Sequence, residues 1–215
     1  ACGAEGTSVI YNAAREPEIV DLQALLRSMG ARVNGAGGSI ITVEGGAVLH
    51  GCTHRVIGDR IVCATYLCAA AAAGGEVRLT GVDYRAVSTV ALSLAESGCE
   101  VRSEADAVSL RSTGALRSVR PVRTAPYPGF PTDAQPVLMA ALLRSEGCTV
   151  FVENIFENRY RHVDELSRMG AEIRVAGRVA VVNGVRTLHG AAVKCTDLRG
   201  GAALVIAGLS AEGTT

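Results

Sequence analysis

The 215-residue sequence predicts an α/β protein in which repeated βαβαββ units surround buried inner helices with sheet. Three observations lead to this prediction. A repeat of about seventy residues runs along the chain, helix patterns alternate with strand-like runs, and hydrophobic residues make up 48% of the sequence. A chain of this length and composition can form a sizeable packed core, as one large domain or two small ones.

Glycines that end predicted helices mark the repeat. Gly30, Gly98 and Gly170 each follow a helix-like segment and precede two strand-like runs. Glycine readily adopts the left-handed conformation that closes a helix. The predicted pairs of strands are residues 31–33 and 39–43, 100–102 and 107–110, and 171–175 and 179–182.

Two further series share this period. Glu-Gly or Gly-Gly pairs recur at 5–6, 74–75, 146–147 and 212–213, and strand-like runs follow the first three at 7–10, 77–79 and 149–152. Asp59, Asp133 and Asp197 each shortly precede an apolar helix pattern. The string Ala-Glu-Gly-Thr occurs at both 4–7 and 211–214. We therefore expect three repeat lengths, cut in the middle of a unit.

The predicted helices are of two kinds. Residues 22–29 and 87–94 carry apolar side chains at positions i, i+3, i+4 and i+7, which is typical of a helix that buries one face. Segments Ile61–Ala73 and Ala202–Leu209 are apolar nearly all round. We expect these two helices to be buried.

A proline-rich segment, Arg123–Gln135, interrupts this pattern. It holds three of the six prolines, and Pro121 and Pro136 flank it. Each proline fixes φ and removes an N–H donor, so the segment cannot be a central strand or a helix interior. An apolar helix pattern follows at Val137–Leu143. The sequence therefore predicts a stiff loop that presents Asp133 at the start of a buried helix, a common setting for binding residues.

Composition and motifs exclude several classes of function. A net charge of zero argues against nucleic acid or an anionic membrane as the main partner. The seven cysteines form no C-x-x-C pair, which fits buried thiols in a reducing compartment better than disulfides or zinc. The longest apolar run is too short to span a bilayer and no basic signal segment is present, so we expect a soluble cytoplasmic protein. The sequence contains no P-loop or dinucleotide-binding motif and no histidine ligand spacing, so no cofactor and no metal are expected.

Five strings together resemble one family: Asn12–Ile19, Arg123–Asp133, Phe156–Tyr160, Glu165–Gly170 and Thr196–Arg199. In this order, and over essentially the whole chain, they are similar to UDP-N-acetylglucosamine 1-carboxyvinyltransferase, the enolpyruvyl transferase of peptidoglycan synthesis. The shikimate-pathway enolpyruvyl transferase shares the fold but not these strings. The resemblance implies an inside-out α/β barrel with two domains of three βαβαββ units each and the substrates in the cleft between them.

The same resemblance implies a division of the chain. The family protein is about twice as long, and this chain resembles its second half: residues 1–57 as the last repeat of one domain, and 58–215 as most of the other. The segments that carry the catalytic lysine, the Gly-Cys-Ala loop and the last phosphate-binding arginine are absent, so we expect the chain to be inactive alone. Its expected partners are UDP-N-acetylglucosamine, phosphoenolpyruvate and the missing half. Exposed apolar surface would also allow self-association.

An alternative remains open at this point. Residues 1–215 could form one closed, circularly permuted three-repeat domain that binds a sugar nucleotide or a protein partner without catalysis. In that arrangement the first and last segments would pack in one unit. If they belong to different domains, the chain is a part of the enzyme.

The three aspartates have competing interpretations. Each could be only a helix N-cap, and for Asp59 we prefer this interpretation. The resemblance makes Asp133 the carboxylate that hydrogen-bonds the acceptor hydroxyl of the amino sugar, and such a group could also take its proton. It makes Asp197 an acid in proton transfer.

Arg159 and Arg199 lie beside predicted helix starts, where backbone N–H groups and the helix dipole favour anions. They could be solvated surface charges, but the resemblance makes both contacts of phosphoenolpyruvate, held through a guanidinium fork. Ile155 could be a core residue or, by resemblance, a contact of the nucleotide sugar. Arg60 and Arg123 could add positive potential. The four histidines are expected to be structural or on the surface, and Cys63 and Cys68 to pack as small hydrophobes.

Overall fold

The computed structural model of the protein describes residues 1–195 and 197–215 and contains two compact units. Unit 1 comprises Ala1–Ile57 with Pro126–Pro128, and unit 2 comprises Gly58–Ala125 and Gly129–Thr215. The first and last segments of the chain therefore belong to different units. Thr196, which begins one of the five strings, lies outside the described residues.

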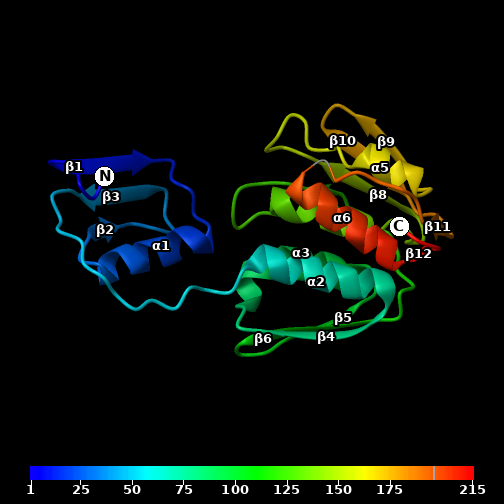
Figure 1. Cartoon of the computed structure of the whole chain (residues 1–215), viewed down its shortest axis with the longest axis horizontal. Coiled ribbons are helices and arrows are strands. Elements are labelled where there is room, and N and C mark those ends of the chain that lie inside the picture. Colours follow the sequence, from blue (N-terminus) through cyan, green and yellow to red (C-terminus); the bar gives the residue numbers. More distant parts are fainter. Residues whose placement is uncertain (196) are drawn as a thin grey trace. The chain divides into compact units, whose positions relative to one another are not determined.

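Unit 1 is one strand–helix–strand–strand module (Figure 1). Its elements are β1 (Thr7–Tyr11), α1 (Pro17–Ser28), β2 (Arg32–Asn34) and β3 (Ile40–Glu44), and its sheet has the antiparallel order β1-β3-β2. Helix α1 begins at Pro17, whose fixed φ suits the first helical turn. Gly30 follows the helix with φ of 97°, as the sequence predicts.

The core of unit 1 is small. Its buried residues are Ala31, Val33, Ile41 and Val43. No residue of α1 is buried, and Leu22 is 48% exposed. The apolar stripe predicted over residues 22–29 is therefore only half covered, because within this unit α1 has a single three-stranded sheet to pack on.

Unit 2 contains the rest of the fold. Its elements are α2 (Arg60–Ala73), β4 (Gly75–Thr80), α3 (Tyr84–Glu96), β5 (Glu100–Ser103), β6 (Ala107–Ser112), β7 (Val122–Arg123), η1 (Thr132–Ala134), α4 (Gln135–Ala141), β8 (Cys148–Val152), α5 (Val163–Arg168), β9 (Glu172–Ala176), β10 (Val179–Asn183), β11 (Leu188–His189), α6 (Leu198–Leu209) and β12 (Ala211–Glu212). From β7 to β10 the chain makes one complete βαβαββ unit.

The sheets confirm the predicted repeat. The complete unit forms a sheet of order β7-β8-β10-β9, in which β7 and β8 are parallel and the other neighbours antiparallel. The preceding sheet, β4-β6-β5, has the same antiparallel arrangement without the first strand. The last pair, β11 and β12, is parallel and corresponds to the first two strands of a third sheet.

Three inner helices form the core of unit 2. Helices α2, α4 and α6 pack against one another, and Figure 1 shows α2 and α6 lying side by side. Every residue of α4 is buried. Cys63 and Cys68 on α2 are also buried among apolar neighbours, as predicted, and burial together with nearby Asp59 raises the pKa of Cys63 to about 11.

The expectation that α2 and α6 are wholly buried is wrong for one face of each. Tyr66 on α2 is 58% exposed, and Val205 and Leu209 on α6 are 66% and 55% exposed. The helices are exposed because one covering sheet is small. Two sheets of unit 2 have at least three strands, whereas the third has only β11 and β12 in the described part of the chain. Apart from Thr196, which was not searched, none of the helices is both long and apolar enough to cross a membrane.

Candidate functional site

The proline-rich segment forms a pinned loop at the N-terminus of α4. The Thr124 N–H donates to the Val152 carbonyl and the Ala125 N–H to the Phe130 carbonyl, both at 3.0 Å, and Thr124 bridges to Phe130. The segment begins in β7, which contains no proline and is the edge strand of the sheet β7-β8-β10-β9. The short helix η1 then carries Asp133 directly into buried α4, which is the arrangement predicted from the sequence.

The Asp133 carboxylate lies between two arginines. Arg159 Nη2 donates to Oδ1 at 2.5 Å, and Arg199 Nη2 approaches Oδ2 at 3.4 Å. The second distance is long for a charged hydrogen bond, so Arg159 is the principal partner. Asp133 does not cap α4, whose N-cap is Ala134 without a side-chain bond. The capping interpretation of Asp133 is therefore wrong.

The other two aspartates do cap helices. Asp59 Oδ1 accepts from the Ile61 and Val62 N–H groups at 2.7 and 3.0 Å. Asp197 Oδ1 accepts from the Arg199 and Gly200 N–H groups at 3.0 and 2.8 Å. The capping interpretation of Asp59 is confirmed. For Asp197 the cap is present and fixes the turn that carries Arg199, while its role in proton transfer stays a prediction.

Neither arginine is a freely solvated surface charge. The side chains of Arg159 and Arg199 are only 18% and 24% exposed, against 41% for Asp133. The Arg159 guanidinium also lies 5.2 Å from the centre of the Phe156 ring, within the range of a cation–π contact. These contacts hold two cationic groups and one carboxylate at a single place, built from three segments distant in sequence.

Three further candidates were predicted from the sequence: Ile155, Arg60 and Arg123. Ile155 follows β8 and is 39% exposed, so its interpretation as a core residue is wrong, and its contact with a nucleotide sugar stays a prediction. Arg123 is exposed and Arg60, the first residue of α2, is partly buried. Their contribution to the potential of the site also stays a prediction.

One residue of the site escapes sequence reasoning. Glu153 is completely buried, and its carboxylate accepts four hydrogen bonds from two neighbouring segments, the proline-rich loop and the turn at Ile155 and Phe156. The only sequence feature that points to it is an acidic residue directly after an apolar strand, Cys148–Val152. Neither periodicity nor motif spacing distinguishes such a residue from a solvated one at a strand end.

Most of the buried polar atoms without a partner belong to residues close in sequence to Asp133 or Arg159. Outside Thr196, five buried side-chain atoms have no hydrogen bond: Glu16 Oε2, Gln135 Oε1, Arg159 Nε, and both ring nitrogens of His162. Such atoms are rare in folded proteins because each costs free energy. Four of these five belong to Gln135, Arg159 and His162, which lie on the segments that carry Asp133 and its partners.

His162 supports the turn between Arg159 and α5 and packs under the start of α6. A Cβ atom added at Gly200 would lie 3.0 Å from His162 Cβ. Burial lowers the pKa of His162 to about 4, although the Asp197 carboxylate and the Arg159 backbone act in the opposite direction. The imidazole is therefore neutral at pH 7, which agrees with the predicted structural role.

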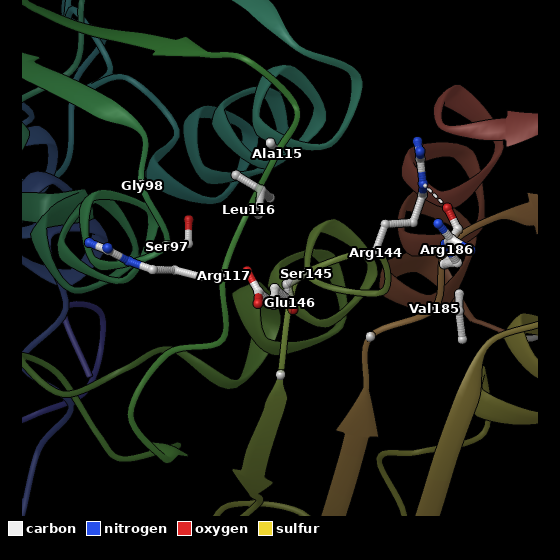
Figure 2. A pocket seen from close by; sticks show the side chains of 12 residues that line it. Ser97, Gly98, Ala115, Leu116, Arg117, Arg144, Ser145, Glu146, Val185 and Arg186 are labelled. Carbon is white, nitrogen blue, oxygen red and sulfur yellow. Dashed lines mark hydrogen bonds between the residues drawn. The ribbon is translucent and has the colours of Figure 1, made fainter.

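A separate cavity of about 620 Å³ lies at the other end of α4, beyond its C-terminus (Figure 2). Arg117 lies on one side, with Arg144 and Arg186 on the other. Arg117 Nε donates to the carbonyl of Glu96 at the end of α3, and Arg144 Nη1 to that of Ser210 at the end of α6. Guanidinium groups at helix C-termini satisfy the last carbonyls and complement the helix dipole. This role accounts for two of the three arginines without a ligand.

The cysteines and other ligand-type side chains form no metal centre in the searched part of the chain: apart from Thr196, no cluster of three or more His, Cys, Asp and Glu residues could hold an ion. The seven cysteines are free thiols.

Comparison with known proteins identifies the architecture. A sequence model of the family described as EPSP synthase (3-phosphoshikimate 1-carboxyvinyltransferase) matches residues 1–215. The chain belongs to the EPSP synthase family. The predicted family resemblance and fold class are confirmed.

Two curated relatives are similar to this chain over nearly its whole length. The chain is 52% identical over 214 residues to UDP-N-acetylglucosamine 1-carboxyvinyltransferase of Gluconacetobacter diazotrophicus, a match that covers 100% of this chain and 51% of that protein. It is 52% identical over 212 residues to UDP-N-acetylglucosamine 1-carboxyvinyltransferase 1 of Symbiobacterium thermophilum, covering 99% and 48%. The chain spans about half the length of the curated relatives it matches. These relatives are transferases, in agreement with the predicted enzyme class.

Solved structures of the family have the same fold. The enolpyruvyl transferase NikO from Streptomyces tendae aligns with a TM-score of 0.77 at 26% identity, over 98% of this chain and 50% of that one. EPSP synthase from Acinetobacter baumannii aligns with a TM-score of 0.69 at 22% identity, over 98% and 51%, and supports the fold alone.

Proposed function

We propose that this chain forms part of an enzyme that transfers the enolpyruvyl group of phosphoenolpyruvate to the 3-hydroxyl of UDP-N-acetylglucosamine. Two lines of support meet here. Relatives that are 52% identical over at least 99% of the chain carry the name of this transferase. The observation that carries the proposal is the cluster of Asp133, Arg159 and Arg199, which joins an acceptor-binding carboxylate to two anion-binding groups.

In the proposed reaction, Asp133 accepts a hydrogen bond from the sugar hydroxyl and can take its proton. The arginines hold the carboxylate of phosphoenolpyruvate. Each guanidinium has five N–H groups, and Asp133 accepts one hydrogen bond from each arginine. Donors therefore remain for an anionic substrate.

The start of α6 contributes through side chains rather than through its first amides. Asp197 occupies the N–H groups of Arg199 and Gly200, so these two donors are not open to a ligand. The Arg199 guanidinium extends from this capped turn instead. Asp197 is thus placed to orient Arg199, and we propose that it also participates in proton transfer.

The proposed chemistry balances without a further group. A proton adds to the methylene carbon of phosphoenolpyruvate, and the sugar oxygen bonds to the adjacent carbon to form a tetrahedral adduct. Loss of a proton from the methyl carbon and departure of phosphate restore the double bond. The guanidinium groups stabilise the dense negative charge of two anionic substrates. No step requires a metal or an organic cofactor.

The rest of the family length would complete the site. We propose that the missing half supplies the other wall of the cleft and the catalytic lysine and cysteine, and that domain closure brings both walls around the substrates. In the cell the reaction would serve peptidoglycan synthesis in the cytoplasm. The alternative, one closed non-catalytic domain, has less support, because Ala1–Ile57 and the C-terminal segment fall in different units.

Calorimetric titration tests the proposed half-site directly. The 215-residue chain is titrated with UDP-N-acetylglucosamine, with and without phosphoenolpyruvate. We expect binding that Asp133→Ala abolishes. Asp59→Ala is the matched control, since Asp59 has the same phase in the repeat but only caps α2. Equal binding by wild type and Asp133→Ala would contradict the assignment of Asp133.

A further inference from the structure

We propose that Glu153 is a positioning residue, whose buried carboxylate holds the loop carrying Asp133 and the turn carrying Arg159 in one fixed arrangement. The expected effect of Glu153 on substrate binding rests on the proposed function. Its effect on the order of the two segments can be tested without a substrate.

The two carboxylate oxygens of Glu153 fasten different segments. Oε1 accepts from Thr124 Oγ1 at 2.9 Å and from the Ile155 and Phe156 N–H groups at 2.8 and 3.0 Å. Oε2 accepts from Thr132 Oγ1 at 2.9 Å. Thr124 and Thr132 lie on the two arms of the proline-rich loop, so one side chain joins both arms to the turn after β8.

These contacts close a ring that includes the candidate site. Thr132 is bonded to Asp133 through the backbone, Asp133 pairs with Arg159, and Arg159 lies over the Phe156 ring. The Phe156 N–H then returns to Glu153. Glu153 thus connects the segment of Asp133 to the segment of Arg159 through contacts that are separate from their ion pair. The distance between Asp133 and Arg159 is therefore restrained by the hydrogen bonds of Glu153 as well as by their own ion pair.

The surroundings of Glu153 explain why its carboxylate keeps one orientation. The side chain is fully buried, and its four donors are two hydroxyls and two amides. A buried carboxylate is costly unless it is hydrogen-bonded in this way, so the carboxylate and its donors order one another. Behind it, the Glu153 N–H donates to the Arg178 carbonyl at 2.8 Å, and the Tyr160 hydroxyl donates to the same carbonyl at 3.2 Å.

The choice of partners indicates a role in the site. All four donors belong to the two segments that carry Asp133, Ile155 and Arg159, and none belongs to the inner helices. Loss of the carboxylate should therefore loosen the site before it loosens the core. Thr149 of β8 offers the contrast, because it is also buried, but its hydroxyl oxygen accepts a hydrogen bond at 3.2 Å from the Val119 N–H, which lies on neither of these two segments.

The test compares Glu153→Gln, Glu153→Ala and the control Thr149→Val in the complete chain. We expect affinity for UDP-N-acetylglucosamine with phosphoenolpyruvate to fall about tenfold in Glu153→Gln, the effect of one weakened charged hydrogen bond, and further in Glu153→Ala. The side-chain carbonyl of glutamine can still accept from the Ile155 and Phe156 N–H groups, so Glu153→Gln should keep more of the affinity than Glu153→Ala. Thr149→Val should lower the melting temperature without weakening affinity. Wild-type affinity in Glu153→Gln, or an equal loss in Thr149→Val, would overturn the proposal.

Amide hydrogen exchange separates this inference from the proposed function. In Glu153→Ala, the Ile155 and Phe156 amides should exchange much faster than in wild type, while Thr149→Val leaves them protected. This readout needs no ligand. If wild type binds neither substrate, the proposed half-site fails while exchange still decides the role of Glu153. If these two amides stay protected in Glu153→Ala, the positioning role is refuted whatever the binding result.

Discussion

The ion pair between Asp133 and Arg159 should make a measurable contribution to stability. Exposed pairs contribute about 0.2–1 kcal/mol, whereas breaking a fully buried pair costs about 3–5 kcal/mol. The side chains here are 41% and 18% exposed, with 2.5 Å between Oδ1 and Nη2. Arg199 lies 3.4 Å from Asp133, so we expect it to compensate in part for the loss of Arg159. We therefore expect a coupling energy of about 1 kcal/mol, near the exposed end of the range.

A double-mutant cycle measures this coupling. Asp133→Ala, Arg159→Ala and the double variant are unfolded in urea at pH 7, and the coupling is the departure from additivity. Arg178 and Glu157 serve as the control pair, because they are 4.0 Å apart and 48% and 92% exposed. Their coupling should be near zero. A coupling between Asp133 and Arg159 below about 0.3 kcal/mol, the usual error of additivity, would refute the ion pair as the element that organises the site.

Three further predictions concern stability and association. Burial lowers the pKa of His162 from 6.5 to about 4, so the unfolded chain binds the proton more readily than the folded chain. The free energy of unfolding, measured in urea, should therefore fall by up to about 3 kcal/mol as the pH drops from 6.5 to about 4. The fall should be smaller in His162→Leu. Gly184→Ala should lower the melting temperature strongly, because its Cβ would lie 1.5 Å from the Ser145 carbonyl oxygen, whereas Gly3→Ala, which meets nothing within 4 Å, should be near neutral. Val205→Asp should reduce self-association in light scattering without lowering the melting temperature, since Val205 is 66% exposed on α6; unchanged association would exclude this face as the contact.

Features of the fold that depend on local chemistry could be predicted from the sequence. Gly98 and Gly170 follow their helices with φ of 108° and 92°, because closing a helix in this way needs a residue that tolerates the left-handed region. The stiff loop before α4 is equally local, since each proline restricts its own backbone. Strand pairs after each helix were predicted to within a few residues for the same reason.

Features that depend on distant neighbours could not be predicted. Asp59, Asp133 and Asp197 share one phase of the repeat, yet only the first and third cap helices. Asp133 differs because the fold brings Arg159 and Arg199 to it, and no local pattern encodes that meeting. Glu153 was missed because its four donors lie on two segments whose contact is tertiary.

The exposure of the inner helices shows a similar limit. An apolar segment such as Ile61–Ala73 can be buried on every face of its helix. Its sequence does not show which sheets or helices are present to cover those faces. In unit 2, α4 is covered on all sides, whereas α2 and α6 each keep an exposed apolar face. The sequence therefore predicts the character of a helix more reliably than its final exposure.

An activity measurement on a chimera tests the proposed function most directly. The half of the Gluconacetobacter diazotrophicus relative that this chain does not match is fused to the chain, and phosphate release from phosphoenolpyruvate is followed with UDP-N-acetylglucosamine present or absent. We expect phosphate release that depends on the sugar nucleotide and is lost in Asp133→Ala but kept in Asp59→Ala. A folded chimera that releases no phosphate, while the intact relative does, or one that is unaffected by Asp133→Ala, would contradict the proposed function.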